Sequence, residues 1–250
     1  MSTVDTAVGR FIWHDHGSGD PDAARRFYAD LLGWDFEIWQ AGEWDYPMIK
    51  VDDTTHGGFG PAQEGAPPHW LGHVLVDDVD AAVGRVEAAG GTIVSPAMDI
   101  PEVGRFAVVA DPQGAVFSLY ASKGDPQPSE GVFVWDELMT TDVEAAKRFY
   151  GEVVGWESRD QDMGPGGVYT LFSSGGVDRA GCFPLPEEGQ VPPSWMTYIG
   201  TADVDATAAK AKELGAEIKK EPLDVPTVGR LAILADPQGA VVGLFQPEAQ

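Results

Sequence analysis

Apolar and polar positions in the first half of the chain follow two periods. From Arg10 to His16, apolar side chains alternate with polar ones, which predicts a strand with one buried face. Between Asp20, a helix-capping residue type, and Gly33, a helix-ending one, the apolar residues recur at helical spacing: Ala24, Phe27, Tyr28 and Leu31. Three strand-like segments follow, and the same order begins again at Trp70. The first 121 residues are therefore predicted to hold two βαβββ units.

The second half of the chain repeats the first. VGRFAVVADPQGAV, Val103–Val116, matches VGRLAILADPQGAV, Val228–Val241, at eleven of fourteen positions. Each copy reads as two strands joined by an Asp-Pro-Gln-Gly turn. Two further blocks recur: Phe11–Trp34 matches Phe133–Trp156, and Pro67–Ala82 matches Pro192–Thr207. Such a duplication indicates four βαβββ units in series.

This order predicts an α+β fold with two domains. Domain 1 is expected to span residues 1–121 and domain 2 residues 131–250. The segment between them, residues 122–130, is polar and rich in proline, and it has no hydrophobic period. It is predicted to be a linker.

Charge and cysteine content narrow the class of protein. The chain has 40 acidic and 16 basic side chains, a net charge of −24, which argues against nucleic acid or an anionic membrane as a partner. The single cysteine, Cys182, is expected to be a buried thiol and cannot form a disulfide within the chain. The N-terminal residues show no signal-peptide pattern, and no apolar run has the length of a membrane span. We expect a soluble, cytoplasmic protein.

The repeated residues also mark a known family. A helix capped by aspartate, carrying Phe-Tyr and ending in Gly-Trp, occurs at 20–34 and 142–156, and Asp-Pro-Gln-Gly occurs at 111–114 and 236–239. This combination resembles the vicinal oxygen chelate superfamily of glyoxalase I, extradiol dioxygenases and bleomycin-resistance proteins, and especially its two-domain, glyoxalase-like actinobacterial branch. The resemblance covers nearly the whole chain. It implies that each domain curls eight strands into a cupped sheet that holds a small ligand.

The resemblance also implies where metal ligands would lie. Metal-dependent members carry one ligand on the opening strand, one on the strand before the second helix, and one after the Asp-Pro-Gln-Gly turn. In the two halves of this chain those positions hold Trp13, Leu71 and Ser118, and Trp135, Met196 and Gly243. Neither set suits a divalent cation, so no metal or other cofactor is predicted.

A register shifted by two residues keeps the same strand face and leaves a divalent metal as an alternative. It brings in Asp15, His73 and Tyr120 in the first half, and Glu137, Tyr198 and Phe245 in the second. Asp15 with His73 could supply half of a metal site. His14 and His16 lie on the opposite strand face and are expected to meet a helix or solvent.

Three of these residues are candidates for chemistry: Asp15, His73 and Glu137. A carboxylate on a sheet face can act as a general base or anchor a ligand donor, and histidine titrates near neutral pH. Each carboxylate could instead bind backbone N–H groups or an arginine. The candidates for ligand contact are Trp13, Leu71, Ser118, Tyr120, Trp135, Met196, Tyr198 and Arg105. For Arg105, a structural salt bridge is the alternative.

Three functions remain open from the sequence. The first is a small-molecule binding protein with an aromatic pocket and without the usual metal triad, acting as a monomer or homodimer. The second is a lyase, isomerase or oxygenase of the hydroxylase kind that uses Asp15 and His73, with or without a metal. The third is an interaction protein whose cups are filled by side chains. The unsuited ligand positions favour the first, with its site in the N-terminal domain.

Overall fold

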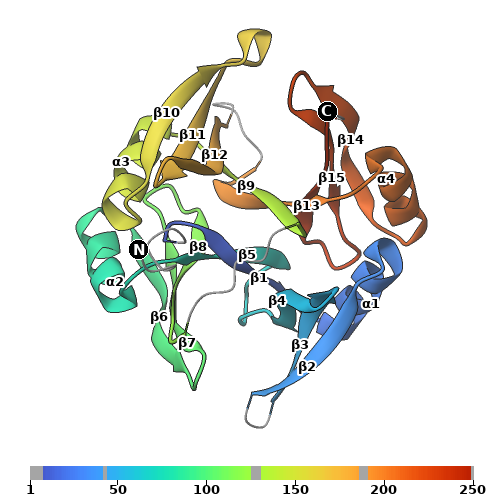
Figure 1. Cartoon of the computed structure of the whole chain (residues 1–250), viewed down its shortest axis with the longest axis horizontal. Helices are drawn as coiled ribbons and strands as arrows, with labels where there is room; N and C mark the ends of the chain where they lie inside the picture. Colours follow the sequence, from blue (N-terminus) through green and yellow to red (C-terminus); the bar gives the residue numbers. More distant parts are fainter. Residues whose placement is uncertain (1–7, 42–43, 125–130, 186–190, 249–250) are drawn as a thin grey trace. The chain divides into compact units, whose positions relative to one another are not determined.

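The computed structural model describes residues 8–41, 44–124, 131–185 and 191–248, so residues 125–130 of the predicted linker lie outside it. The first half forms β1 (Phe11–Ser18), α1 (Pro21–Leu32), β2 (Asp35–Ala41), β3 (Trp44–Val51), β4 (Thr54–Pro61), β5 (His69–Leu75), α2 (Val79–Ala88), β6 (Thr92–Ile100), β7 (Gly104–Ala110) and β8 (Val116–Ser122) (Figure 1). None of the described helices is long and apolar enough to cross a membrane.

The second half repeats this order. It forms β9 (Phe133–Thr140), α3 (Val143–Val153), β10 (Glu157–Asp162), a short 3₁₀ turn (Gly164–Gly166), β11 (Val168–Ser174), β12 (Val177–Pro184), β13 (Ser194–Gly200), α4 (Val204–Glu213), β14 (Glu217–Val225), β15 (Gly229–Ala235) and β16 (Val241–Pro247). The predicted α+β fold of four tandem βαβββ units is confirmed.

The strands form two eight-stranded mixed sheets of the same topology. Their orders are β2-β3-β4-β1-β5-β8-β7-β6 and β10-β11-β12-β9-β13-β16-β15-β14. Within each βαβββ unit the opening strand pairs in parallel with the last strand, as β1 does with β4 and β5 with β8. The repeated sequence blocks thus occupy equivalent places in the two sheets.

The predicted helix starts are present in all four units. Asp20 and Asp142 accept hydrogen bonds from the backbone N–H groups three residues on, at 2.9 Å each. Asp78 and Asp203 do the same at 3.0 and 2.9 Å. Each aspartate therefore satisfies an N–H group that the first helical turn leaves unpaired.

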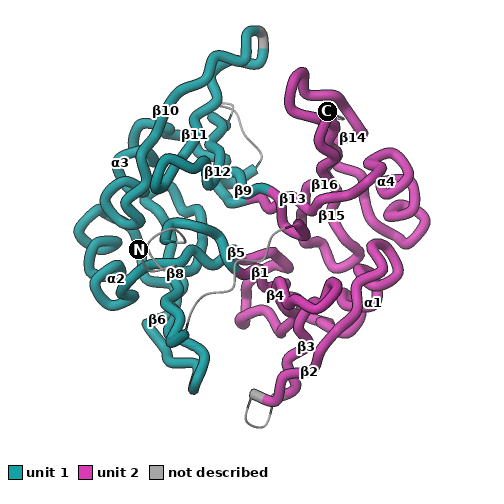
Figure 2. The backbone as a smooth tube through the Cα atoms, in the orientation of Figure 1, with its two compact units in different colours: residues 1–12, 72–128, 135–195 teal, residues 13–71, 129–134, 196–250 magenta. Residues whose placement is uncertain are grey.

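The chain folds into two compact units, whose boundaries differ from those of the two sheets (Figure 2). Unit 1 comprises residues 1–12, 72–128 and 135–195, and unit 2 comprises 13–71, 129–134 and 196–250. In unit 1, α2 packs on α3; in unit 2, α1 packs on α4. Each core therefore joins one βαβββ unit from each half of the chain, which the sequence pattern did not indicate.

The repeated motifs build these cores. In unit 1, Tyr150 of the Phe-Tyr pair donates its hydroxyl hydrogen bond to Asp111 of the turn at 3.1 Å, and Trp195 donates to Tyr150 at 2.9 Å. Unit 2 contains the equivalent hydrogen bonds: Tyr28 donates to Asp236 at 3.1 Å, and Trp70 donates to Tyr28 at 3.0 Å. These residues recur because they connect the two halves of the chain inside each unit.

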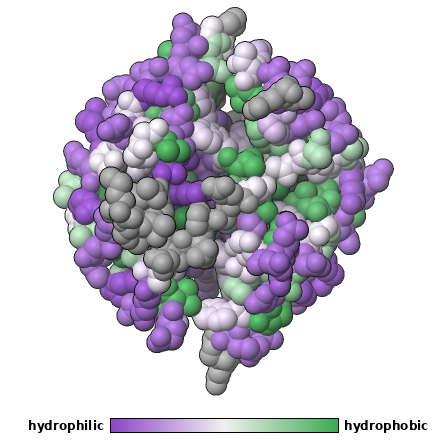
Figure 3. Space-filling view, in the orientation of Figure 1, coloured by the Kyte–Doolittle hydropathy of each residue, from purple (hydrophilic) through white to green (hydrophobic). Residues whose placement is uncertain are grey.

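Two single residues, Cys182 and His56, are buried. Cys182 is a buried thiol, as predicted, and burial raises its pKa to about 12. His56 lies inside β4 and is only 3% exposed. On the molecular face in Figure 3, hydrophilic residues predominate, in keeping with the high content of acidic side chains.

Candidate ligand-binding site

Strand β1 presents two different faces. His14 and His16 are buried, and the ring of His16 packs against Tyr28 of α1, so this face meets the helix. Trp13 and Asp15 alternate with them and are half-buried. They therefore lie on the sheet face opposite the helix.

A third side chain joins Trp13 and Asp15. The Trp13 indole Nε1 donates to Asp15 Oδ1 at 3.0 Å and to the Tyr46 hydroxyl at 2.9 Å, and the Tyr46 hydroxyl donates to Asp15 Oδ1. Tyr46 comes from β3, two strands away in the sheet order. All three side chains belong to unit 2.

Unit 1 contains the same cluster at the repeat-related positions. Trp135 Nε1 donates to the Tyr169 hydroxyl at 2.9 Å, and this hydroxyl donates to Glu137 Oε2 at 2.8 Å. All three side chains are half-buried, as in unit 2. We call each set a Trp–carboxylate–Tyr cluster: Trp13, Asp15 and Tyr46 in unit 2, and Trp135, Glu137 and Tyr169 in unit 1.

Each cluster depends on one glycine. Gly58 pairs with Asp15 across β4 and β1, and Gly181 pairs with Glu137 across β12 and β9. A Cβ atom at Gly58 would lie 2.1 Å from the Tyr46 hydroxyl oxygen, and one at Gly181 would lie 1.7 Å from that of Tyr169. Only glycine lets the phenol cross the neighbouring strand and reach the carboxylate.

The clusters hold their tyrosines in the protonated form. Burial, followed by the negative charge of Asp15, raises the pKa of Tyr46 well above its ordinary value. Burial and the charge of Glu137 likewise raise the pKa of Tyr169. Each phenol therefore remains a donor to its carboxylate at neutral pH, while each indole N–H fixes the position of the phenol oxygen.

A second buried polar group lies on the helix face of unit 2. The His16 Nε2 atom lies 2.7 Å from Asp236 Oδ2, and both side chains are fully buried. Burial acts to raise the pKa of Asp236, but the hydrogen bond and charge of His16 and the backbone donors outweigh it, so this pKa is lowered. In unit 1, where Leu138 replaces the histidine, burial dominates and the pKa of Asp111 is raised.

These opposite shifts predict opposite pH effects on stability. Because its pKa is lower in the folded state, Asp236 stabilises the fold above about pH 4, the ordinary aspartate value, and that contribution is lost as the pH falls through the folded-state pKa. The contribution of Asp111, whose pKa is raised, is present at low pH and lost as the pH rises through its folded-state pKa. In urea unfolding from pH 2.5 to 6, Asp236→Asn should flatten the acid loss of stability and Asp111→Asn should steepen it. Equal slopes in both variants would contradict this assignment.

Comparison with known proteins identifies the family. Residues 12–120 match the model of a glyoxalase-like domain, and residues 133–244 match the model of the glyoxalase/bleomycin resistance protein/dioxygenase superfamily. A relative from Mycobacterium tuberculosis, named "Putative glyoxylase CFP32", is 36% identical over 95% of both chains. The chain belongs to the glyoxalase/bleomycin resistance protein/dioxygenase superfamily.

Three further proteins are similar to this chain over most of their length. The "Anthracycline biosynthesis protein DnrV" of Streptomyces peucetius is 35% identical over 94% of this chain and 92% of its own. A Mn(II)-bound glyoxalase from Novosphingobium aromaticivorans aligns with a TM-score of 0.64 and 22% identity, over 96% of this chain and 82% of its own. The 2,3-dioxygenase LapB from Pseudomonas sp. KL28 aligns with a TM-score of 0.65 and 16% identity, over 97% and 93%. These two structures share the fold with this superfamily member.

The side chains at the metal-ligand positions predicted from the sequence do not suit a divalent cation. Trp13 and Trp135 occupy the first position, and their only polar atoms, the indole N–H groups, are donors used within the clusters. Gly243, at the third position in the second half, lies against the Tyr198 ring, which a Cβ atom there would approach within 2.2 Å. Within the described ranges, no three His, Cys, Asp or Glu side chains form a group that could hold a metal ion.

Three further first-half candidates, His73, Ser118 and Tyr120, lie in unit 1. His73 is 6% exposed, pairs with Ser118 across β5 and β8, and lies edge-on to Phe106 with ring centroids 6.3 Å apart. Ser118 is fully buried. Tyr120 donates its hydroxyl hydrogen bond to the Val103 carbonyl at 3.2 Å. Asp15 belongs to unit 2, so its use together with His73 remains a prediction.

Arg105 shows the contacts of the salt-bridge alternative. Its guanidinium lies 2.8 Å from Asp80 and 3.1 Å from Asp99. Arg230, at the repeat-related position, contacts Asp205 and Asp224 in the same way. Both arginines therefore connect a helix to the edge of its sheet.

The remaining ligand-contact candidates lie in unit 2. Met196 and Tyr198 are 4% and 5% exposed, while Leu71 is half-buried. The role of these residues in ligand contact stays a prediction.

The tyrosines of the clusters were missing from the candidates. Tyr46 and Tyr169 are 123 residues apart, between the separations of 122 and 125 residues that relate the repeated blocks. Each tyrosine precedes its glycine, Gly58 or Gly181, by twelve residues. The flanking sequences have diverged, so the repeat was not recognised there. Aligning the two halves through this region would have shown both pairs.

Proposed function

We propose that the protein binds a small molecule against its Trp–carboxylate–Tyr clusters. The observation that carries this proposal is the presence of the same half-buried hydrogen-bonded cluster in both units. It lies on the sheet face opposite the helices. Buried polar groups are costly, so their repetition favours a role in binding.

The chemistry of the clusters favours a planar, hydroxylated aromatic ligand without negative charge. Indole and phenol rings offer faces for stacking, and a carboxylate can accept hydrogen bonds from ligand hydroxyl groups. The net charge of −24 disfavours anions. Curated relatives named for anthracycline biosynthesis support the same class, because anthracyclines are built on a hydroxylated, fused-ring system.

Removing the two phenol hydroxyls tests this function. We expect wild-type protein to bind 1,8-dihydroxyanthraquinone, followed by quenching of tryptophan fluorescence. The double variant Tyr46→Phe/Tyr169→Phe should bind it at least about tenfold more weakly, because each carboxylate that accepts from the ligand loses the hydroxyl that holds it in position. Tyr150→Phe is the matched control, since that hydroxyl contacts Asp111 and Trp195 in the core of unit 1. Unchanged affinity in the double variant would contradict the proposal.

Because the donor set does not suit a metal, removing metal ions should leave binding intact. Protein dialysed against EDTA is expected to bind the anthraquinone probe with an unchanged dissociation constant, and re-addition of manganese, iron or zinc should not strengthen it. A metal-dependent gain of tenfold or more would favour the shifted ligand register with Asp15 and His73. Elemental analysis of the same samples identifies any ion that remains.

An enzymatic role is the second candidate. The observation in its favour is that each tyrosine hydroxyl donates to a carboxylate, which supports Asp15 and Glu137 as candidates for general bases. The relatives named as glyoxylases support this class. Conversion of the methylglyoxal–glutathione hemithioacetal is the assay: turnover by wild type that is lost in Asp15→Asn or Glu137→Gln would establish it, and no turnover would exclude this reaction.

A further inference from the structure

His69 lies beside the Trp–carboxylate–Tyr cluster of unit 2. It opens β5, the strand next to β1 on the side away from β4. Trp13, Asp15 and Gly17 alternate along β1 and therefore share one sheet face. A Cβ atom at Gly17 would lie 3.0 Å from the His69 Cε1 atom and 3.3 Å from its Nε2 atom. The half-buried imidazole therefore covers Gly17 on the same face as Asp15.

The imidazole contributes a hydrogen-bond acceptor to this face. Within the described part of the chain, the ring's hydrogen bond joins Nδ1 to the Pro67 carbonyl oxygen, at 2.8 Å. Because a carbonyl oxygen only accepts, Nδ1 carries the proton of the neutral imidazole and Nε2 is the acceptor. His69 therefore differs from the indole and the phenol of the cluster, which both act as donors.

The second half of the chain has different residues at these two positions. Met139 stands at the position of Gly17, and Ser194 at that of His69, while the cluster itself is retained in unit 1. The two changes are physically related, because a side chain at position 17 would approach the imidazole closely. The glycine–histidine pair is therefore a feature of unit 2 that a cluster does not need in order to form.

Two acceptors thus belong to one sheet face of unit 2: the Asp15 carboxylate and the His69 Nε2 atom. Asp15 and Gly17, the residue beneath the imidazole, are roughly 7 Å apart along β1. Leu71 is half-buried, lies two residues from His69 on β5, and adds an apolar surface to this face. A planar, uncharged aromatic ligand with a hydroxyl group at each end supplies donors to both acceptors.

We propose that His69 determines the specificity of the unit 2 site: its Nε2 atom accepts a hydrogen bond from a second hydroxyl group of the aromatic ligand, while Asp15 accepts from the first. This inference rests on the proposed binding at the Trp–carboxylate–Tyr clusters and defines the ligand class of one of them. Unit 2 selects dihydroxylated aromatic ligands, whereas unit 1, with Ser194 in place of the histidine, does not.

Two probes that differ by one hydroxyl group test this role. The probes are 2,6-dihydroxynaphthalene and 2-naphthol, which are planar and uncharged at pH 7. In ¹H–¹⁵N spectra of the full chain, the Trp13 indole signal reports binding in unit 2, and the Trp135 signal reports binding in unit 1. The preference for the dihydroxy probe should be about fivefold stronger at Trp13 than at Trp135, the effect of one net hydrogen bond.

Two variants remove and transfer the acceptor. His69→Phe keeps an aromatic ring at the same place, and the preference at Trp13 should fall to that at Trp135, with the affinity for 2-naphthol unchanged. The double variant Met139→Gly/Ser194→His introduces the glycine–histidine pair into unit 1 and should give Trp135 the preference of Trp13. Circular dichroism should show that both variants are folded. A folded double variant without this preference would overturn the proposal.

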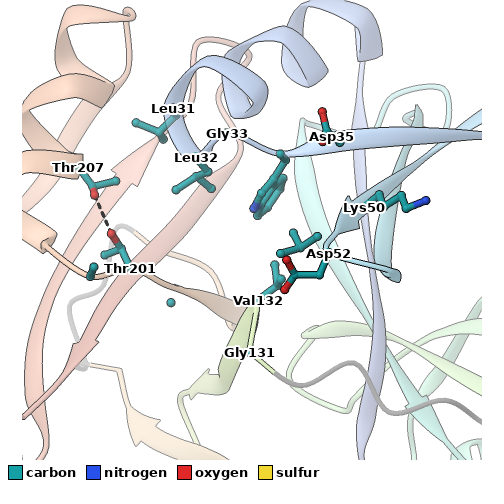
Figure 4. Close-up of a pocket in the computed structure, with 14 residues that line it drawn as sticks. Leu31, Leu32, Gly33, Asp35, Lys50, Asp52, Gly131, Val132, Thr201 and Thr207 are labelled. Atoms are coloured by element: carbon teal, nitrogen blue, oxygen red, sulfur yellow. Dashed lines mark hydrogen bonds between the residues drawn. The ribbon is translucent and has the colours of Figure 1, made fainter.

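A groove elsewhere in unit 2 provides the control for binding at another place. It has a volume of about 500 Å³, and Leu32, Asp52 and Thr201 contribute to its lining, whereas His69 and the cluster do not (Figure 4). Ala202→Trp places a large side chain at an exposed position of this lining and should leave the Trp13 titration unchanged. Loss of the Trp13 shift in this variant would place the probe in the groove and overturn the role of His69.

The results distinguish failure of this role from failure of the proposed function. If neither probe shifts the Trp13 or Trp135 signals, binding at the clusters is contradicted, and the role of His69 with it. If Trp13 shifts without a stronger preference than Trp135, or keeps that preference in His69→Phe, the role of His69 is wrong and binding at the clusters stands.

Discussion

Replacing Asp236 by alanine is expected to lower the free energy of unfolding by about 3–5 kcal/mol, because several buried donors lose their shared carboxylate acceptor, at about 1–3 kcal/mol for each unsatisfied group. Its Oδ1 atom accepts hydrogen bonds from the backbone N–H groups of Gln238, Gly239 and Ala240. Its Oδ2 atom contacts the Tyr28 hydroxyl and His16 Nε2. Alanine leaves all of these buried groups without their acceptor.

Asp111→Ala is the matched control, because it removes the same turn residue from unit 1. Asp111 binds its own turn and Tyr150, but the position of His16 is taken there by Leu138. Its loss should therefore cost less, about 1–3 kcal/mol for the unsatisfied polar groups. Urea unfolding at pH 7 measures both values. Equal losses in the two variants would show that the His16–Asp236 contact adds nothing to stability.

Adding one methyl group to the glycine beneath each cluster tyrosine should weaken ligand binding as strongly as removing the tyrosine hydroxyl. Gly58→Ala and Gly181→Ala place a Cβ atom 2.1 and 1.7 Å from the tyrosine oxygens, which forces Tyr46 and Tyr169 away from their carboxylates. With both substitutions, the affinity for 1,8-dihydroxyanthraquinone should fall at least about tenfold. Calorimetric titration of the double variant measures this loss.

Gly60→Ala provides the control for this pair. Gly60 lies on β4 two residues beyond Gly58, and a Cβ atom there meets nothing within 4 Å. The control should bind the probe as the wild type does, and both proteins should remain folded by circular dichroism. Weakened binding in Gly60→Ala to the same degree would point to a general effect on β4 instead of the position of the phenol.

Local sequence patterns predicted the elements well because their causes are local. The aspartate caps at Asp20 and Asp142 act on N–H groups three residues away, and the Asp-Pro-Gln-Gly turns bond within themselves. The duplication then doubled every such signal. The α+β fold and the four βαβββ units could therefore be predicted without coordinates.

These local patterns could not predict the contacts between the repeats. Tyr28 and Asp236 are 208 residues apart, and nothing near either residue indicates that they share a hydrogen bond. The same limit hid the His16 contact and the division into units. At the candidate site, the strand period placed Trp13 and Asp15 on one face, but Tyr46 reaches them from another strand across a glycine. That contact depends on the order of the strands in the sheet and on the tyrosine side chain extending across β4.

The indole signals of Trp13 and Trp135 in ¹H–¹⁵N spectra give the most direct test of ligand binding at the clusters. On titration with 1,8-dihydroxyanthraquinone, these two N–H groups, which donate to Tyr46 and Tyr169, should shift as the sites fill. Those of Trp70 and Trp195, which donate to Tyr28 and Tyr150 on the helix side, should stay in place. A probe that binds by calorimetry while Trp13 and Trp135 remain unmoved would contradict ligand binding at the Trp–carboxylate–Tyr clusters.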